Sequence, residues 1–256
     1  MGERVLGHER VGDGARRVIV LNDWICDTST WDDARPYLDR AAFTWVFADL
    51  RGYGRSRGYG GRCDVAECVG DVLALADHLG WERFSIVGHS MSTYAAMRLG
   101  QTHADRVERA VLVTPGPPRG FGADAQWLAQ AEETARDDAK RAEMIRQRFT
   151  GRLSAGWAAR KAERWVERSD AEAAAGYIAM YARDGLPEPG APIAAPVLAI
   201  TGDEDAPVMR RDAVLSALTP LCARLEVVGL ANVGHYPMQE MPPYTVALVE
   251  RFLSGA

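Results

Sequence analysis

Residues 84–97 read FSIVGHSMSTYAAM, in which an apolar run meets a helix-forming run at a serine between small residues. The first four residues are typical of a buried parallel strand, and the residues after Ser92 favour a helix. The chain must therefore turn sharply between Gly88 and Ser92, with Ser90 in the middle of the turn. The other motifs of the chain are arranged around this serine.

A strand-to-helix turn of this kind requires small residues two positions before and after the serine, because larger side chains would collide with the backbone. Gly88 and Ser92 satisfy this requirement. Residues 88–92 resemble the nucleophile elbow of the α/β-hydrolase family, whose usual form is G-x-S-x-G. The departure is Ser92, and because serine is nearly as small as glycine we expect slightly looser packing rather than loss of the turn.

Short apolar runs alternate with helical patterns over most of the chain. The predicted strands cover residues 4–10, 17–21, 43–48, 84–87, 107–113, 196–201 and 224–228, and the predicted helices outside the elbow cover residues 32–40, 64–80, 209–218 and 240–253. Such alternation implies a mostly parallel sheet with helices on both faces. The resemblance implies the α/β-hydrolase fold, which commonly begins with two antiparallel strands, whereas only one fits before the turn at residues 12–14.

The alternation stops between residues 120 and 189, where several helical patterns follow one another without a strand. This segment resembles the helical cap that the family inserts after its sixth strand. The resemblance implies a core domain of residues 1–118 and 190–256 and a cap of residues 119–189. A cap in this place would form a roof over Ser90.

Aromatic side chains are candidates for the wall of a pocket beneath that roof. Most of the aromatic residues of a cap pack it onto the core, so we expect only two or three of them to face a substrate. The pocket candidates are Trp24, Ile25, Trp127, Trp157, Tyr177, Tyr181 and Tyr236. The indole of Trp24 is interpreted either as a wall of the acyl pocket or as part of the core.

Residues 49–56 read DLRGYGRS and are similar to a D-x-R-G-x-G-x-S loop of the same family. Gly52 and Gly54 supply turn conformations, and we expect Asp49 and Arg51 to tie the loop down. A phosphate-binding loop is the alternative, but the spacing fits neither the Walker motif nor the dinucleotide-binding fingerprint. We therefore expect a structural role for this loop.

Length and composition limit the possible classes of protein. With 256 residues, of which 47% are hydrophobic, the chain is long enough to bury one sizeable core. The net charge of −5 argues against nucleic acid as a partner, and the arginines of residues 136–168 alternate with acids, as on a solvated helix face. The chain has no run of about eighteen uncharged apolar residues and no apolar signal core, so we expect a soluble, cytoplasmic protein without membrane contact.

The four cysteines and five histidines show no metal-binding or disulfide pattern. Cys26, Cys63, Cys68 and Cys222 contain no C-x-x-C pair, and the histidines do not cluster with them. We therefore expect neither a disulfide framework nor a metal site. The chemistry implied by the elbow also needs no organic cofactor.

A serine hydroxyl becomes an effective nucleophile only when a base removes its proton and an acid orients that base. Residues 201–207 read TGDEDAP and resemble the family's acid loop, in which the aspartate follows the glycine by three positions. The resemblance assigns the acid to Asp205, with Asp203 and Glu204 as competing carboxylates. His235, after a glycine between the last strand and the last helix, corresponds to the base. Serine, aspartate and histidine thus follow in the family's order.

The tetrahedral intermediate of ester hydrolysis carries a negative oxygen that needs two backbone N–H donors. The resemblance implies that Met91, directly after the serine, provides one donor and that Trp24, in the loop after residues 17–21, provides the other. The family usually has His-Gly before that second donor, whereas this chain has Asn22-Asp23. A carboxylate facing this oxyanion hole would repel the developing charge, so we expect Asp23 to turn away or to be hydrogen-bonded.

The resulting interpretation is a serine hydrolase that cleaves a small-molecule carboxylic ester or lactone through an acyl-enzyme. Residues 23–27 are also similar to the loop of cofactor-independent quinolone dioxygenases, but their acid follows the sixth strand, where this chain has Thr114. Carbon–carbon bond hydrolases and perhydrolases share the same triad and are separated poorly by the sequence. A small-molecule binding protein with little turnover is the last alternative, which the Asn22-Asp23 pair keeps open.

Overall fold

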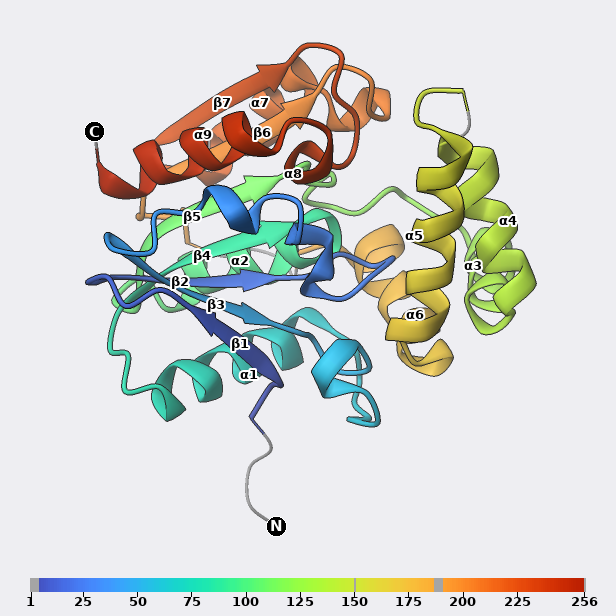
Figure 1. Cartoon of the computed structure of the whole chain (residues 1–256), viewed down its shortest axis with the longest axis horizontal. Coiled ribbons are helices and arrows are strands. Elements are labelled where there is room, and N and C mark those ends of the chain that lie inside the picture. Colours follow the sequence, from blue (N-terminus) through green and yellow to red (C-terminus); the bar gives the residue numbers. More distant parts are fainter. Residues whose placement is uncertain (1–4, 150, 187–190, 256) are drawn as a thin grey trace.

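A seven-stranded sheet forms the centre of the computed structural model, which describes residues 5–149, 151–186 and 191–255 (Figure 1). The strands are β1 (His8–Val11), β2 (Arg16–Leu21), β3 (Phe43–Ala48), β4 (Phe84–His89), β5 (Val107–Val113), β6 (Val197–Gly202) and β7 (Leu225–Leu230). Their order is β1-β3-β2-β4-β5-β6-β7, with β1 antiparallel to β3 and all other neighbours parallel. The expected mostly parallel sheet is confirmed.

The central strands are apolar because both faces of the sheet are covered. Every residue of β3, β4 and β6 is buried, as are the last four residues of β2 and β5. A strand covered on both faces gains hydrophobic stabilisation along its length, which explains the unbroken apolar runs of the sequence. The edge strand β7 is only partly buried.

Helices cover the two faces of this sheet. They are α1 (Val65–His78), α2 (Thr93–Thr102), α7 (Arg211–Leu218) and α9 (Pro242–Ser254). Helix α1 packs against α2, and α2 packs against β4 and β5, whereas α9 packs on the turn Arg35–Tyr37. In Figure 1, α9 lies in front of the sheet and α2 lies behind it. The helices predicted over residues 64–80 and 209–218 are present with slightly shorter bounds.

The helix predicted over residues 32–40 is wrong. One 3-10 turn, Thr28–Trp31, comes directly before this region, and a second, Arg35–Tyr37, lies within it. Proline has no N–H group and its ring collides with the carbonyl four residues earlier, so Pro36 prevents a continuous α-helix. In the structure Pro36 lies in the first positions of the second turn, where no N–H donor is needed.

The helix predicted over residues 240–253 is present as α9, with slightly shifted bounds. The short helix α8 (Pro237–Glu240) ends at Met241, whose φ of −144° and ψ of 57° are not helical, and α9 begins at the next residue. Both helices begin with proline, which suits the first helical position. The break at Met241 leaves the Glu240 side chain free to turn back toward the loop after β7.

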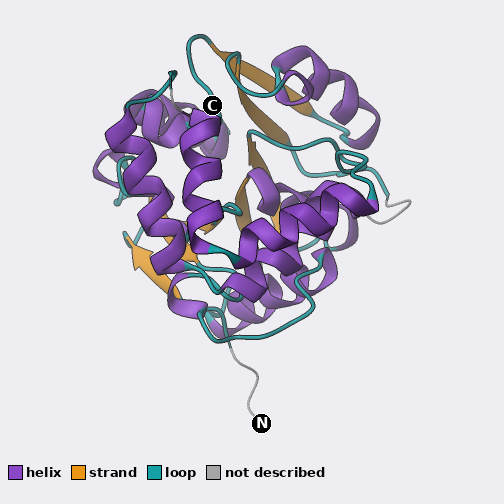
Figure 2. Ribbon diagram, turned by 90° about the vertical axis from the view of Figure 1, so that its right-hand side faces the viewer, coloured by secondary structure: helices purple, strands orange, loops and turns teal. Residues whose placement is uncertain are grey.

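The described residues between β5 and β6 form four α-helices: α3 (Ala125–Arg136), α4 (Asp138–Phe149), α5 (Ala155–Arg168) and α6 (Ala171–Ala179). We name them, with their connections over residues 119–186, the helical insert. The insert lies beyond the carboxyl ends of the strands, on the right in Figure 1 and toward the viewer in Figure 2. It follows this chain's fifth strand rather than a sixth, because only β1 precedes β2. The domain boundaries stay predictions, and residues 187–190 lie outside the described residues.

The loop at residues 49–56 is tied to the turn after β2 and to α1. Oδ1 of Asp49 accepts hydrogen bonds from the N–H and the hydroxyl of Thr28 at 2.8 and 2.7 Å. Arg51 forms a bidentate ion pair with Asp71, at 2.7 and 2.8 Å. The two side chains that were expected to hold the loop therefore do so.

Two further features concern membranes and metals. Within residues 5–149, 151–186 and 191–255, no helix combines the length and the apolar character that crossing a membrane requires. The same residues contain no group of three or more His, Cys, Asp or Glu side chains placed to hold a metal ion. The four cysteines are free thiols, and three of them are buried.

Candidate active site

Ser90 lies on the tight turn that joins β4 to α2. Its φ is +53°, a left-handed conformation that costs a serine roughly 1 to 3 kcal/mol. The Ser90 carbonyl accepts a hydrogen bond from the hydroxyl of Thr93 at 2.6 Å, which helps to hold the turn. The turn presents the serine to a small space that Trp24 and Tyr181 also border.

The small residues on either side of Ser90 have separate roles. A Cβ atom on Gly88 would lie 2.8 Å from the carbonyl oxygen of Ser92, so a larger residue would force β4 and α2 apart. The Ser92 hydroxyl accepts a hydrogen bond from the His89 N–H at 2.9 Å and donates one to the His89 carbonyl at 3.1 Å. Ser92 therefore bridges the turn, a role that its size alone did not predict.

Three side chains from separate loops meet at Ser90. The Ser90 hydroxyl donates to Nε2 of His235 at 2.9 Å, and Nδ1–H of His235 donates to Oδ2 of Asp205 at 2.7 Å. Asp205 follows β6 and His235 follows β7, so all three residues lie beyond the carboxyl ends of parallel strands. In such a line the imidazole can take the serine proton while the carboxylate stabilises the imidazolium that forms.

Asp205 keeps its negative charge although it is buried. Burial alone would raise its pKa, but the adjacent His235 and the N–H of Ala206 outweigh this effect and lower the pKa to about 2. The Ala206 N–H donates to Oδ1 at 2.7 Å, which leaves Oδ2 for the histidine. The competing carboxylates of Asp203 and Glu204 are exposed.

The main chain around His235 is held from several directions. Its carbonyl accepts hydrogen bonds from Nε2–H of His89 at 2.8 Å and from the hydroxyl of Thr114 at 3.3 Å. The Glu240 carboxylate accepts from the N–H groups on either side of His235, at 2.8 and 3.0 Å. These bonds position the imidazole between the serine and the aspartate.

A sequence match that decides the family extends over nearly the whole chain. The family model described as "Alpha/beta hydrolase family" matches residues 18–248, from β2 into α9. The chain belongs to the α/β-hydrolase family. The matched residues include Ser90, Asp205 and His235.

Individual relatives of this α/β-hydrolase carry several names. It is 27% identical over 259 residues to pimeloyl-[acyl-carrier protein] methyl ester esterase of Sodalis glossinidius, covering 94% of this chain and 95% of that protein. It is 31% identical to epoxide hydrolase B of Mycobacterium tuberculosis over 116 residues, covering 40% of this chain and 33% of that protein. A thermophilic esterase from Thermogutta terrifontis superposes with a TM-score of 0.80 at 21% identity, covering 98% and 93% of the two chains.

The loop after β2 is held by its own polar side chains. Nδ2–H groups of Asn22 donate to two carbonyls of the loop at 2.8 and 3.1 Å, and Oδ1 accepts from the N–H of Leu50 at 2.7 Å. The Tyr53 hydroxyl donates to the carbonyl of Trp24 at 2.7 Å. These bonds fix the backbone at Trp24, which borders the same small space as Ser90 and Met91.

Both oxygens of the Asp23 carboxylate accept hydrogen bonds. This agrees with one of the two arrangements that we expected for Asp23, a hydrogen-bonded carboxylate. Oδ2 accepts from the Tyr236 hydroxyl at 2.9 Å, and Oδ1 accepts from the Thr30 hydroxyl and the Cys26 N–H at 3.2 and 3.3 Å. Lys161 of α5, only 4% exposed, donates to the same Thr30 oxygen at 3.1 Å. Burial would raise the pKa of Asp23, but Lys161 and Tyr236 help to hold it below its ordinary value.

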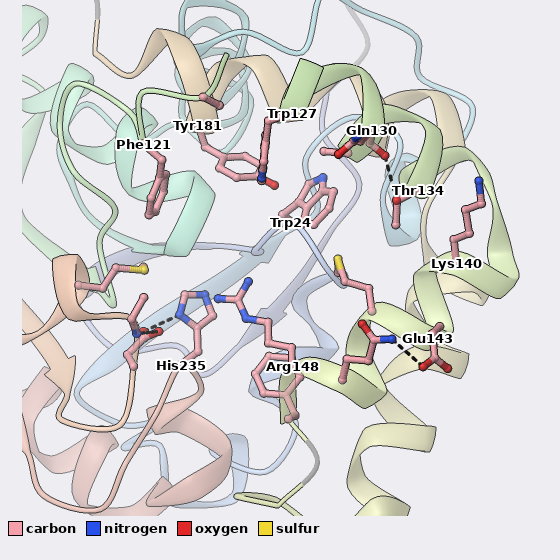
Figure 3. Close-up of a pocket in the computed structure, with 18 of the residues that line it drawn as sticks. Trp24, Phe121, Trp127, Gln130, Thr134, Lys140, Glu143, Arg148, Tyr181 and His235 are labelled. Atoms are coloured by element: carbon pink, nitrogen blue, oxygen red, sulfur yellow. Dashed lines mark hydrogen bonds and ion pairs between the residues drawn. The ribbon is translucent and has the colours of Figure 1, made fainter. Parts of the chain in front are cut away.

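A main cavity of about 1050 Å³ lies between the helical insert and the loops after β6 and β7 (Figure 3). Asp205 and His235 border it on the sheet side, and Trp127 borders it on the insert side. A smaller space of about 60 Å³ adjoins it, and we name this the serine chamber. Residues around the serine chamber include Trp24, Ile25, Ser90, Met91, Phe121 and Tyr181.

The predicted pocket residues divide into two groups. Trp24 and Tyr181 border both spaces, Ile25 borders the serine chamber and Trp127 borders the main cavity. Trp157, Tyr177 and Tyr236 border neither space, and the prediction for these three was wrong. The ring of Trp157 packs on Phe149 and Tyr236, at centroid distances of 5.2 and 5.4 Å. Tyr177 packs on Tyr53 at 5.8 Å. These rings fill the layer between insert and sheet, where their large apolar surface is shielded from water.

Three charged residues of the site were not identified from the sequence. Lys161 and Arg148 lie in helices whose charged patterns are typical of solvated faces, and Glu240 is the last residue of the short helix α8. Nothing in the spacing distinguishes them from their exposed neighbours.

Proposed function

We propose that this α/β-hydrolase is a carboxylic ester hydrolase that acts on small-molecule esters or lactones through an acyl-enzyme. The single observation that supports this most directly is the hydrogen-bonded line from Ser90 through His235 to Asp205. The similarity to a methyl ester esterase over almost the whole length of both chains agrees with it.

The proposed reaction uses His235 to move a proton in both halves of the cycle. Ser90 Oγ attacks the ester carbonyl carbon while its proton passes to Nε2 of His235. The intermediate collapses, the bond to the alcohol oxygen breaks, and His235 returns the proton to that oxygen. Water then attacks the acyl-enzyme by the same route, which releases the carboxylic acid and restores the serine.

Backbone N–H groups stabilise the negative oxygen of each intermediate in this proposal. We assign this role to Trp24 and Met91, which border the serine chamber beside Ser90. Loss of one such donor costs on the order of 3 kcal/mol of transition-state stabilisation. The three hydrogen bonds accepted by Asp23 keep its carboxylate occupied, so that it does not act as a free repelling charge.

Two other reaction classes fit the site less well. Attack of Ser90 on an epoxide would join the serine to the substrate through an ether. An ether has no carbonyl carbon for water to attack, so the enzyme would not be regenerated. The quinolone-type reaction needs an acid on the loop after β5. Thr114 occupies that position and donates a hydrogen bond to the His235 carbonyl instead.

Replacing Ser90 with alanine tests the proposed nucleophile. Hydrolysis of p-nitrophenyl butyrate should fall by about a thousandfold or more, because no hydroxyl remains to form the acyl-enzyme. The rate is followed by release of p-nitrophenol. A fluorophosphonate should add to the wild-type protein and not to Ser90→Ala, as measured by intact mass.

Ser216→Ala, on the exposed face of α7, is the matched control and should behave like wild type. Equal hydrolysis by wild type and Ser90→Ala would contradict the proposal. Oxygen consumption with a quinolone would favour the dioxygenase alternative. Tight ester binding without turnover would favour a binding protein.

A further inference from the structure

A cation of the helical insert faces the proposed catalytic histidine. Arg148, near the end of α4, borders both the main cavity and the serine chamber, and its guanidinium is directed toward His235 in Figure 3. Its charge is one of the causes that lower the pKa of Asp205, in agreement with this position. Arg148 therefore lies where it can contact a molecule bound at Ser90.

Arg148 differs from the cations around it in its lack of a carboxylate partner. Lys140, Arg141, Arg146 and Arg152 form ion pairs with Glu133, Asp138, Glu143 and Glu240, respectively. Among the residues that the structure describes, no carboxylate oxygen lies within 4.0 Å of the Arg148 guanidinium. Its central carbon lies 5.5 Å from the ring centroid of Phe149. The five N–H donors of Arg148 are thus available to a ligand.

The acids that border the two spaces do not offer Arg148 a counter-charge. Asp23 and Asp205 accept hydrogen bonds from other groups, and Asp124 caps the beginning of α3. Glu143 is paired with another arginine of α4, and Glu204 is exposed to solvent. The positive charge beside the serine chamber is therefore left for a bound anion.

We propose that Arg148 binds a carboxylate of the substrate, so that the preferred substrates are half-esters of dicarboxylic acids. A guanidinium presents parallel N–H donors that match the two oxygens of a carboxylate, and such charge-assisted bonds are about twice as strong as neutral ones. The apolar walls at Ile25, Met91 and Phe121 suit the neutral ester group. This inference rests on the proposed esterase function, which places the ester group at Ser90.

The position of Arg148 predicts an effect on the chemical step as well as on binding. His235 becomes positively charged when it accepts the serine proton, and a neighbouring cation opposes this change. A substrate carboxylate bound to Arg148 neutralises that cation. A half-ester should therefore show a higher kcat and a lower KM than a neutral ester of the same shape.

The test compares monomethyl glutarate with methyl 4-carbamoylbutanoate, in which a neutral carboxamide replaces the carboxylate. Acid release is followed in a pH-stat, and wild type should show a kcat/KM about 10- to 100-fold higher for the half-ester. The corresponding succinate and adipate pairs determine which spacing fits best. Arg148→Met should remove the preference, and Arg148→Lys should keep part of it, because the charge remains without the planar fork.

Arg146→Met is the matched control, since Arg146 lies on the same helix, pairs with Glu143 and borders neither space. Calorimetric titration with glutarate measures carboxylate binding without turnover. Binding by wild type and by Arg146→Met, with loss in Arg148→Met, supports the proposal. The proposal is overturned if Arg148→Met prefers the half-ester, or binds glutarate, as strongly as wild type does. It is also overturned if wild type shows no preference for the half-ester at any of the three chain lengths.

The same experiments separate this inference from the proposed function. A wild type that hydrolyses neither charged nor neutral esters contradicts the esterase function, whereas glutarate binding that depends on Arg148 still supports the carboxylate site. Hydrolysis of both esters at equal rates agrees with the esterase function and overturns the role of Arg148. Binding of inorganic phosphate in place of glutarate also overturns the proposed carboxylate recognition.

Discussion

At the scale of single residues, burial determines the state of the elbow histidine. His89 is fully buried, and its Nε2–H donates to the His235 carbonyl at 2.8 Å. Among the described residues, Nδ1 of His89 has no hydrogen-bond partner. Burial is the main cause that lowers the pKa of His89 to about 4, so the ring is neutral at neutral pH. A neutral ring with its proton on Nε2 supports the main chain of the proposed base.

The burial of His89 predicts a pH-dependent stability. As the pH falls from 6.5 to about 4, the unfolded chain binds a proton at His89 that the folded protein does not, so the free energy of unfolding decreases. The expected loss is roughly 3 kcal/mol. Urea unfolding of His89→Gln between about pH 6.5 and 4.5 should show a weaker pH dependence than that of wild type.

His78→Gln is the control for this series, because His78 is exposed on α1. It should leave the pH dependence of unfolding as it is in wild type. An equally steep dependence in His89→Gln would show that His89 does not cause the loss of stability.

At the scale of elements, helix α5 reaches the loop after β2 through one buried lysine. Nζ of Lys161 lies 4.0 Å from the ring centroid of Tyr236 and 3.1 Å from Oγ1 of Thr30. Tyr236 and Thr30 each donate a hydrogen bond to Asp23. The insert therefore compensates a buried negative charge next to the proposed oxyanion hole, a charge that would otherwise be costly.

Replacing Lys161 with methionine should destabilise the fold and slow the reaction. The free energy of unfolding should decrease by about 2 to 4 kcal/mol, because the charge of Asp23 loses its compensation. The kcat for p-nitrophenyl butyrate should fall as well, since the uncompensated carboxylate would oppose the charge that develops in the oxyanion hole. Chemical denaturation and steady-state kinetics measure the two effects.

A double-mutant cycle identifies the cause of these losses. Addition of Asp23→Asn to Lys161→Met should restore part of the lost stability, because no buried charge then remains. Arg160→Met, an exposed change on the same helix, should have an effect below about 0.5 kcal/mol. Strictly additive effects of the two substitutions would exclude a charge coupling between Lys161 and Asp23.

At the scale of the whole molecule, the helical insert lies beyond the carboxyl ends of the strands (Figures 1 and 2), and residues of the insert and of the strand-end loops border the site together. Nε1–H of Trp24 donates to the carbonyl of Ala174 at 2.7 Å, and its ring packs on Trp165 at a centroid distance of 4.8 Å. The carbonyl of Gly52 accepts a hydrogen bond from the N–H of Asp170 at 2.7 Å. The loops that surround Ser90 therefore also hold the insert in place.

Substitution of Gly52 tests this boundary. Gly52 has a φ of +78°, and a Cβ atom there would lie 2.0 Å from Cβ of Ala173 in α6. Gly52→Ala should lower the free energy of unfolding by about 3 kcal/mol, of which about 1 kcal/mol reflects the left-handed backbone and the rest reflects overpacking. Thermal and chemical denaturation measure the change.

Gly58→Ala is the matched control, because Gly58 has a φ of +75° but no atom within 4 Å of the position that a Cβ atom would occupy. It should show only the conformational part of the loss, about 1 kcal/mol. Equal losses in Gly52→Ala and Gly58→Ala would contradict the close packing of α6 on this loop.

Local patterns of the sequence determined the sheet, the turn at Ser90 and the family. Strand and helix periodicity, and the need for small residues beside a tight turn, depend only on neighbours along the chain. The proposed acid and base were predicted from short motifs, and the structure brings Asp205 and His235 within hydrogen-bond distance of each other. The error over residues 32–40 also has a local cause, since Pro36 interrupts the predicted helix.

Only the tertiary structure decided which other residues complete the site. Lys161 contacts Thr30 across 131 positions of the chain, and Tyr236 contacts Asp23 across 213 positions. The approach of Arg148 to the serine chamber depends on how the insert packs on the sheet. A sequence pattern shows which side of a helix is apolar, but the partner of each polar side chain is determined by the packing of distant elements. For that physical reason the sequence alone predicted Ser90, Asp205 and His235, and only the folded chain determined which residues surround them.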